Sequence, residues 1–459
     1  MPFARHILSV LALLFAGCEA MKGPQAIGTL KLDAPATYAK AQSGQNERIS
    51  TGWLSDFGDA RMTQVVNEAL KQNHDLQAAA YRLRAAKEGN IIRRAARLPS
   101  LSAGTSYRRS DSEVTATTEN YSLSLNASWE PDLWGRLRNL ERATRADYAS
   151  SLADFRAARL SLAANTASAW CNLVTAELQL NLARTTVASY KRALPVVESR
   201  YKKNLLRAVD VQFARNNVAS AERTLRIREL NRGNAARALE LLLGRYPSAS
   251  ISSSSQLPSL SKNVPAGIPA QLIERRPDLQ AERAVLYASA QRAEATRKNL
   301  LPNIRLSGGA SGGEDSFKRV LDPTFLAYSA AASLSQTIYN GGALNANARA
   351  ALQRNKAQLH VYSQTALRAF REVEAALQAE TSLAEQEIFL KKEVAQTNIA
   401  EKRALDDITR GIEGSSFLEY LEAQRRAENA RASLIRLRND RLQNRIDLYL
   451  SLGGDFKTR

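Results

Sequence analysis

Apolar and polar residues alternate strictly in the stretch from Tyr121 to Glu130, which has the sequence YSLSLNASWE. A period of two places successive side chains on opposite faces of a β-strand, so this stretch is predicted to form a strand with one apolar and one polar face. Similar alternation follows Leu98, Leu301 and Leu326. The sequence therefore predicts four strands, at about 99–109, 119–132, 302–312 and 324–340.

Most of the remaining chain has the pattern of long helices. The 68 residues from Leu137 to Asn204 would span about 100 Å as one continuous helix, at about 1.5 Å per residue. Apolar residues in this stretch recur at the seven-residue spacing of a coiled coil. They are Leu173, Leu180, Val187 and Leu194. The chain is therefore predicted to be mainly helical.

The same plan occurs twice along the chain, which indicates an internal duplication. LPS at 98–100 precedes the first strand pattern as LPN at 301–303 precedes the third, and Asp210 corresponds to Glu419 at an offset of 209. The predicted segments are a first repeat at 51–246, a Ser- and Pro-rich linker at 247–270 and a second repeat at 271–455.

Strands of about ten residues with one apolar face have the length of tilted transmembrane β-strands. Strands of soluble β-sandwiches show the same alternation. Four strands cannot close a barrel in a membrane, because the open edges would leave backbone groups unpaired in hydrocarbon. If this sheet spans a membrane, several chains must contribute to one barrel.

The N-terminus has the pattern of a secretory signal peptide, with Arg5 before a short apolar run and small residues up to Cys18. FAGC at 15–18 resembles the cleavage box of bacterial lipoproteins. This resemblance implies a signal peptide at 1–17 and a lipid on Cys18. Glu19 follows the cysteine in place of Asp, which implies the outer membrane. The alternative is an ordinary signal peptide with an incidental cysteine.

The chain is basic, with 64 Lys and Arg against 45 Asp and Glu and a net charge of +19. Such a charge can serve nucleic-acid binding, but a secreted chain rarely meets nucleic acid, so solvated helix faces explain it better. The three histidines and two cysteines are scattered and form no metal-ligand spacing. Phosphate-binding loops, nucleophile elbows and dinucleotide fingerprints are absent from the sequence. We therefore expect no enzymatic activity, cofactor or metal site.

Seven segments in a specific order make the chain similar to one known family. They are residues Trp53–Ala86, LPSLSAG, EPDLWGRLRN, IERRPDLQAER at Ile273–Arg283, LPNIRLSGGASGG, IYNGGAL and LEYLEAQRR. Together they cover nearly the whole chain from Trp53 to the final LGG. With this order and spacing the chain resembles the TolC family of bacterial outer-membrane efflux proteins. The resemblance is strongest to the lipoprotein branch that serves resistance-nodulation-division pumps.

The resemblance implies a homotrimer in which four strands per chain form a 12-stranded β-barrel in the outer membrane. A long periplasmic α-helical barrel of coiled-coil hairpins would continue it. Tyr121 and Trp129 would face lipid, and the polar side chains between them the pore. The lipidated N-terminal extension 18–50 and the linker would lie near the middle of the α-barrel. The implied function is a passive duct that exports small molecules received from an inner-membrane transporter and a periplasmic adaptor.

The resemblance also implies a pore gate at the periplasmic entrance, made of acidic residues. Glu419 and Glu422 occupy the two positions, and their spacing of three places both on one helix face. Asp210 is the counterpart of Glu419 in the first repeat. The alternative is that these residues are solvated charges that pair with Arg425 and Arg426.

The tips of the two helical hairpins are the expected docking sites for the adaptor. The candidate residues are Asn204, Leu205 and Leu206 in the first tip and Gly411, Ile412 and Gly414 in the second. Asn204 replaces the glycine that is common in the family, and asparagine tolerates the left-handed conformation of a tight turn. The second tip is longer than the first, which bears on how an adaptor would fit.

Two other functions remain open at this point. One is an outer-membrane duct for type I protein secretion, and the other is a structural periplasmic coiled-coil lipoprotein. The two-faced strands argue against the second function, since a tether between envelope layers has no use for them. The sequence does not indicate the cargo. Its three methionines are scattered and give no support for copper.

Overall fold

The computed structural model describes Ala39 and residues 52–111, 113, 117–260, 269–320, 322–412 and 416–454. The predicted signal peptide 1–17, Cys18 and Gly414 lie outside these residues. The described chain divides into two compact units, and each unit takes segments from both predicted repeats. Unit 1 comprises residues 82–152 and 281–364, and unit 2 comprises residues 52–81, 153–280 and 365–454.

Corresponding helices of the two repeats have nearly equal lengths. They are α3 (His74–Ala95) and α7 (Pro277–Lys298) with 22 residues each, α4 (Arg136–Lys202) and α9 (Ala343–Arg410) with 67 and 68, and α5 (Ala208–Leu242) and α10 (Phe417–Ser451) with 35 each. The shorter helices are η2 (Trp53–Phe57), α2 (Ala60–Gln72), α6 (Pro269–Arg275), α8 (Phe317–Val320) and η3 (Pro323–Phe325). This correspondence agrees with an internal duplication.

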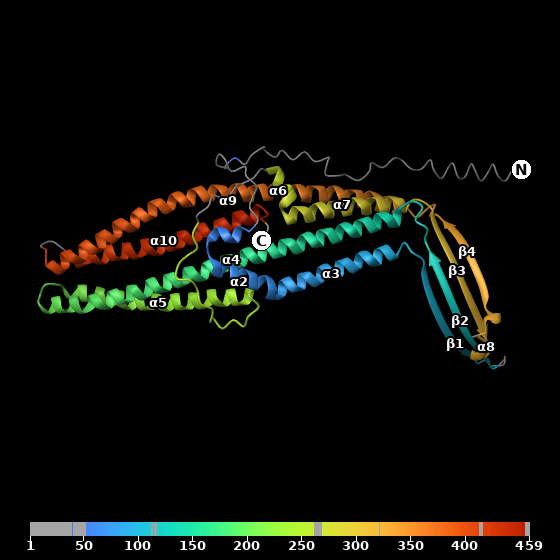
Figure 1. Cartoon of the computed structure of the whole chain (residues 1–459), viewed down its shortest axis with the longest axis horizontal. Helices are drawn as coiled ribbons and strands as arrows, with labels where there is room; N and C mark the ends of the chain where they lie inside the picture. Colours follow the sequence, from blue (N-terminus) through green and yellow to red (C-terminus); the bar gives the residue numbers. More distant parts are fainter. Residues whose placement is uncertain are drawn as a thin grey trace. The chain divides into compact units, whose positions relative to one another are not determined.

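The long helices form two antiparallel hairpins in unit 2. The α4–α5 hairpin and the α9–α10 hairpin each turn at one tip (Figure 1). The predicted heptad residues Leu173, Leu180 and Val187 are buried, as a coiled-coil seam requires. No helix in the described part of the chain combines the length and the apolar composition needed to cross a membrane.

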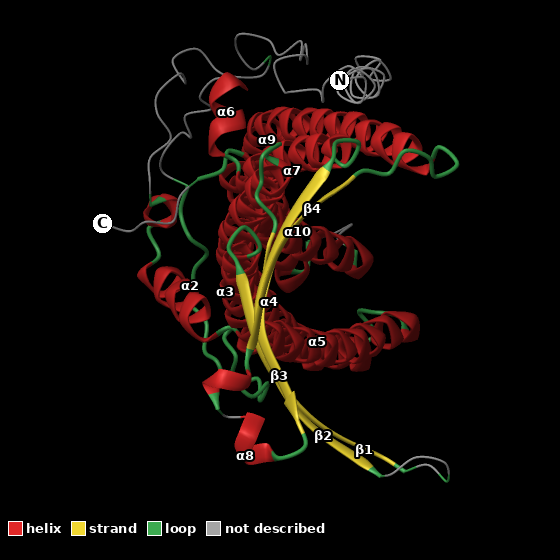
Figure 2. Ribbon diagram, turned by 90° about the vertical axis from the view of Figure 1, so that its right-hand side faces the viewer, coloured by secondary structure: helices red, strands yellow, loops and turns green. Residues whose placement is uncertain are grey.

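Unit 1 contains one antiparallel sheet of four strands in the order β1-β2-β3-β4 (Figure 2). The strands are β1 (Ser100–Ser110), β2 (Thr118–Trp129), β3 (Asn303–Glu314) and β4 (Ala327–Ser335). Four strands are the number that the alternation predicts. Because β2 pairs with β3, the central ladder joins the two repeats, and it begins with Trp129 opposite Leu306.

The fourth strand is shorter than the predicted 324–340, for reasons at both of its ends. Pro323 begins the short helix η3, whose N-cap Asp322 accepts a hydrogen bond from the Thr324 amide at 3.0 Å. At the other end, Ser335 pairs with Asn303, the first residue of β3. Pro302 precedes Asn303 and has no N–H to continue the ladder, so the alternation beyond Ser335 finds no partner.

An aromatic cluster anchors the N-terminal part of unit 2 on α10. Trp53 is fully buried, and its ring stacks on that of Tyr449 with the centroids 5.4 Å apart. The Tyr449 hydroxyl donates a hydrogen bond to Asp56 at 2.7 Å. In the same segment Asp59 caps α2 and accepts a bond from Trp170 of α4 at 2.8 Å. These contacts explain the density of aromatic and acidic residues in WLSDFGD.

The first part of the predicted linker is irregular but fixed to α5. The Glu240 carboxylate accepts hydrogen bonds from the amides of Ala249 at 2.6 Å and Ile251 at 3.0 Å. Arg232 donates to the carbonyl oxygens of the same two residues, each at 2.8 Å. The predicted linker ends inside α6, which begins at Pro269.

Candidate functional site

The long helices α4 and α9 end in the same way at the two hairpin tips. Asn204 has φ of 58° and Gly411 has φ of 71°, both in the left-handed region. In each turn the next residue closes a hydrogen bond to a carbonyl five positions back, from Leu205 to Arg200 at 3.0 Å and from Ile412 to Asp407 at 3.1 Å. This pattern ends a helix by satisfying its last carbonyl groups. Asn204 thus takes the left-handed conformation that glycine takes in the second tip.

Both tips expose apolar side chains. Leu205 is 65% exposed and Ile412 is 49% exposed, and Val209 and Leu418 at the starts of α5 and α10 are also exposed. Leu206, in contrast, packs against a buried cluster formed by the ends of all four helices. That cluster consists of Val197, Val211, Ala214, Ile408, Phe417 and Tyr420. The predicted tip residues therefore divide into an exposed apolar set and one inward-facing leucine.

The predicted gate residues Glu419 and Glu422 lie in the first two turns of α10. Glu419 is exposed and has no ion-pair partner among the described residues. The Glu422 carboxylate accepts hydrogen bonds from Arg425 and Arg426, each at 2.7 Å. The bonds from Arg426 and then Arg425 hold the pKa of Glu422 below its usual value. Within one chain Glu422 is thus paired with both arginines, whereas Glu419 is not.

Asp210 has a local structural role that sequence analysis did not identify. It is buried at the third position of α5 and accepts a hydrogen bond from the Arg207 amide at 3.0 Å. The Arg207 guanidinium also pairs with the carboxylate at 3.4 Å. By accepting from the N-cap amide, Asp210 supplies the acidic half of a capping box, which stabilises the start of the helix. In this chain the Asp210 carboxylate is therefore occupied by its own helix.

The sheet of unit 1 has one polar and one apolar face that run across all four strands. On the polar face the hydroxyls of Ser106 and Ser122 lie 2.7 Å apart, and Ser124 donates to the Gly104 carbonyl at 3.4 Å. On the opposite face the register aligns apolar pairs across each ladder. They include Tyr107 with Tyr121, Ala103 with Leu125, Trp129 with Leu306, Ala310 with Tyr328, and Ile304 with Leu334.

The outer strands β1 and β4 are the edges of this sheet and have a strand neighbour on one side within the described chain. Every residue of both strands is exposed. Their outward backbone groups are therefore available for pairing with another strand.

Ion pairs between the helices of each hairpin hold the hairpins together. In the first hairpin, Glu198 pairs with Arg215 at 2.8 Å and Glu177 with Arg232 at 3.1 Å. In the second, the Glu387 carboxylate accepts from Arg438 at 3.2 Å and also pairs with Arg441. Acidic residues of the long helix and arginines of the return helix thus recur in both repeats.

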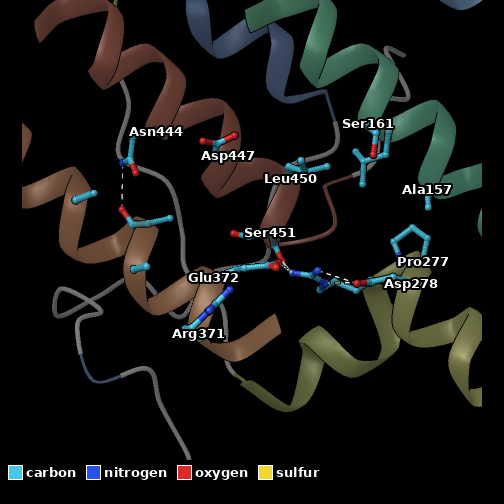
Figure 3. Close-up of a pocket in the computed structure, with 15 residues that line it drawn as sticks. Ala157, Ser161, Pro277, Asp278, Arg371, Glu372, Asn444, Asp447, Leu450 and Ser451 are labelled. Atoms are coloured by element: carbon cyan, nitrogen blue, oxygen red, sulfur yellow. Dashed lines mark hydrogen bonds and ion pairs between the residues drawn. The ribbon is translucent and has the colours of Figure 1, made fainter. Parts of the chain in front are cut away.

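A cavity of about 670 Å³ in unit 2 lies where α4, α7, α9 and α10 approach one another. Its polar centre is Arg276, which pairs with Asp278 and Glu372, each at 2.7 Å, and donates to the Ser451 carbonyl at 3.2 Å (Figure 3). Burial disfavours the charged guanidinium and would lower the pKa of Arg276. The hydrogen bonds to Asp278 and Glu372 outweigh burial and raise this pKa. This arrangement fixes the junction between α6 and α7.

The described residues contain no group of His, Cys, Asp and Glu side chains arranged to hold a metal ion. Cys171 is buried, and burial raises the pKa of its thiol to about 12. A protonated, inaccessible thiol is a poor nucleophile. Its place in the fold is therefore structural.

Comparison with known proteins links these features to one family. The family described as outer membrane efflux protein matches residues 65–245 and 268–454, one match in each repeat. The cation efflux system protein CusC of Escherichia coli K12 is 29% identical, over 97% of this chain and 98% of CusC. Outer membrane protein OprJ of Pseudomonas aeruginosa is 30% identical, over 90% of this chain and 88% of OprJ.

A solved structure, that of the outer-membrane channel OprN, has the same fold. It superposes with a TM-score of 0.84 at 25% identity, over 95% of this chain and 99% of OprN. The proteins matched by family, sequence and structure are efflux proteins and channels, not enzymes. From the double family match, the related sequences and the shared fold, we conclude that this chain belongs to the outer membrane efflux protein family.

Proposed function

We propose that this outer-membrane efflux protein is the passive duct of a tripartite pump and works as a homotrimer. The observation that carries the proposal is the sheet of unit 1, which has one apolar face, one polar face and two edges open to further strands. Open edges are not tolerated in hydrocarbon, because each unpaired backbone group costs several kcal/mol. Three chains of four strands would close a 12-stranded barrel, which is within the known range.

The two faces of the sheet determine how this barrel would sit in the membrane. The face with Tyr121, Leu125 and Trp129 would contact lipid. The opposite face, with Ser122, Ser124 and Asn126, would line a water-filled pore. A polar lining conducts small solutes without binding them tightly, so the cargo class is small molecules delivered from the cell interior.

The hairpin tips would provide the contact with the rest of the pump. Their exposed apolar side chains, Leu205 and Ile412 above all, suit packing against a helical tip of a periplasmic adaptor. The adaptor would connect the duct to an inner-membrane transporter, which supplies the energy. Gly414 of the second tip belongs to the same proposal.

A lipid on Cys18 would be a second anchor beside the barrel. One acyl chain contributes about 0.8 kcal/mol per buried CH₂, whereas the barrel alone suffices to hold the trimer in the membrane. We expect Cys18→Ser to abolish labelling of the protein by radioactive fatty acid and to leave trimers in the outer-membrane fraction. Labelling that persists in the variant would exclude this attachment site.

The proposed function is tested by reconstitution of the purified full-length protein in planar bilayers. We expect particles with three times the mass of the chain and discrete ion-conducting channels. A stable monomer that remains soluble without detergent, or a trimer without conductance, would contradict the proposal.

A further inference from the structure

Neutral polar side chains make several of the contacts between the two hairpins of unit 2, beside the apolar cluster at the tips. Between α4 and α10, the recorded amide and hydroxyl contacts are Asn439 to Asn172 at 2.9 Å, Gln443 to the Ser168 carbonyl at 3.2 Å, and Gln424 to Ser189 at 3.1 Å. We call this set of contacts the α4–α10 seam. The ion pairs described above, by contrast, lie inside each hairpin. Neutral hydrogen bonds of this kind do not respond to pH in the physiological range.

One carboxyl group interrupts the α4–α10 seam. The Tyr190 hydroxyl of α4 donates a hydrogen bond to the Glu428 carboxylate of α10 at 3.3 Å, and the Thr186 hydroxyl also bonds to it. The titratable and charged groups that face Glu428 come from four helices. They are Tyr190 of α4, Arg228 of α5, Glu401 of α9, and Tyr420, Arg425 and Arg431 of α10.

Two of the three nearby arginines are engaged by other carboxylates, and the third, Arg228, lines the cavity beside Glu428 without a recorded ion pair to it. Arg431 is held by Glu401 at 2.5 Å, and Arg425 is held by Glu422 at 2.7 Å. The half-buried Glu428 therefore has a hydroxyl as its direct partner, whereas the buried Glu387 has guanidinium groups.

The protonated form of Glu428 is favoured by this setting. Burial raises its pKa most, and repulsion from Glu401 adds to this, whereas the hydrogen bonds from Tyr190 and Thr186 and the charge of Arg431 lower it. The net result is a pKa of about 7. The Glu428 carboxyl is therefore neutral at mildly acidic pH and ionised at alkaline pH. This change of charge falls within the pH range that a periplasm experiences.

A cavity lies next to Glu428, and water in this cavity could hydrate the ionised carboxylate. Its volume is about 280 Å³, and its lining includes Tyr190, Asn217, Arg228 and Asn429 besides Glu428 itself. That volume has room for several water molecules, since one occupies about 30 Å³ in the liquid. Water entering here would solvate the carboxylate and compete with its bond to Tyr190.

We propose that Glu428 is a proton-sensitive latch in the α4–α10 seam, closed when Glu428 is protonated and loosened when it is ionised and attracts water into the adjacent cavity. The hydrogen bond from Tyr190 stabilises the ionised carboxylate within the closed seam and so opposes the loosening. The latch links the two hairpins of one chain. It requires neither an adaptor nor a transported solute, so it goes beyond the proposed function and does not depend on it.

The direction and size of the effect follow from proton linkage. The pKa of Glu428 is raised in the closed seam relative to about 4.3 for a glutamate in water, so closure is favoured at low pH and weakened as pH rises towards 7. With these two pKa values, the ratio of open to closed seam increases about 20-fold from pH 5.5 to pH 7.5.

Hydrogen–deuterium exchange of the purified full-length protein tests the latch, with labelling times scaled to the intrinsic exchange rate at each pH. In the wild type, we expect peptides covering 186–193 and 424–432 to lose about 20-fold in protection between pH 5.5 and pH 7.5. Glu428→Gln should show the same high protection at both pH values. Tyr190→Phe removes a hydrogen bond to the ionised Glu428 carboxylate and should therefore raise the pKa of Glu428. The loss of protection should then occur at higher pH than in the wild type.

The matched control is Glu222→Gln, which removes a carboxylate that pairs with Lys191 at 2.6 Å inside the first hairpin. This variant should keep the pH dependence of the wild type. Equal protection of the wild type at both pH values, or a Glu428→Gln variant that retains the transition, would overturn the proposal. If Glu428→Gln does not assemble, an unshifted transition in Tyr190→Phe is sufficient to overturn it.

Discussion

Leu125 and Ser124 are neighbours on β2 whose side chains lie on opposite faces of the sheet. If the apolar face contacts lipid, Leu125→Arg places a charge in hydrocarbon and should destabilise the trimer by about 2–4 kcal/mol near the membrane midplane. Ser124→Arg points into water and should be tolerated. The difference in stability between the two variants is measured as the fraction of trimer that survives mild heating in detergent. Equal trimer yields for the two variants would contradict the assignment of the faces.

Glu387 is a buried carboxylate whose partners are all cationic. Burial would raise its pKa, but hydrogen bonds from Lys391, Arg441 and Arg438 outweigh burial and lower it to about 2. Because the folded pKa is depressed, its stabilisation is present above the unfolded pKa of about 4.3 and is lost as pH falls from there towards 2. The pKa difference corresponds to about 3 kcal/mol at neutral pH.

Glu387→Gln should therefore lower the thermal unfolding midpoint at pH 7, measured by circular dichroism of the trimer. The difference from the wild type should shrink below pH 4. Glu222→Gln is the control, since its exposed pair with Lys191 contributes at most about 1 kcal/mol. A Glu387→Gln variant as stable as this control at pH 7 would show that the cluster stabilises little.

At the scale of whole elements, the two hairpins are copies of one design with different tips. The helices have matching lengths, and both turns use a left-handed residue, Asn204 in one and Gly411 in the other. An adaptor that recognises both tips would meet similar exposed apolar residues in each. The second tip is longer, so the two contacts need not be identical.

A photoreactive amino acid at Leu205 or Ile412 should crosslink to the adaptor in cells, because both positions are exposed at the tips. Leu241 is the control position, since it is 69% exposed but lies near the opposite end of α5. Absence of adaptor crosslinks from both tips, in cells with an active pump, would exclude the tips as the docking site.

At the scale of the whole assembly, threefold symmetry would turn single acidic residues into rings. Glu419 and Glu422 together would give six carboxylates, two from each of three chains, at the periplasmic entrance. Such rings attract cations and repel anions in a narrow pore. Since Arg425 and Arg426 offset the charge of Glu422, we expect Glu419 to contribute more to selectivity.

The double variant Glu419→Ala with Glu422→Ala should weaken cation selectivity and block by divalent cations in single-channel recordings. Glu419→Ala alone should show most of the loss, and trimer assembly should be unchanged. Glu222→Ala, which removes a carboxylate within the first hairpin, serves as the control for a general charge effect. Selectivity equal to that of the wild type in an assembled double variant would remove both residues from the gate.

The sequence alone determined the features that depend on short-range periodicity. Alternation along Tyr121–Glu130 predicted a two-faced strand, and the heptads of α4 predicted buried positions, because side-chain direction follows directly from strand or helix geometry. The left-handed turn at Asn204 was predictable for the same reason, since it depends on one residue's own conformational energy. The correspondence of Asp210 with Glu419 indicated the duplication.

Only the tertiary structure decided which of these elements meet. The pairing of Trp129 with Leu306, the end of β4 at Ser335 and the contact of Tyr190 with Glu428 join residues that are far apart in sequence. Such contacts depend on the packing of whole helices and strands, and no local pattern encodes their register. The role of Glu428 as a half-buried acid between two hairpins is therefore a property of the fold.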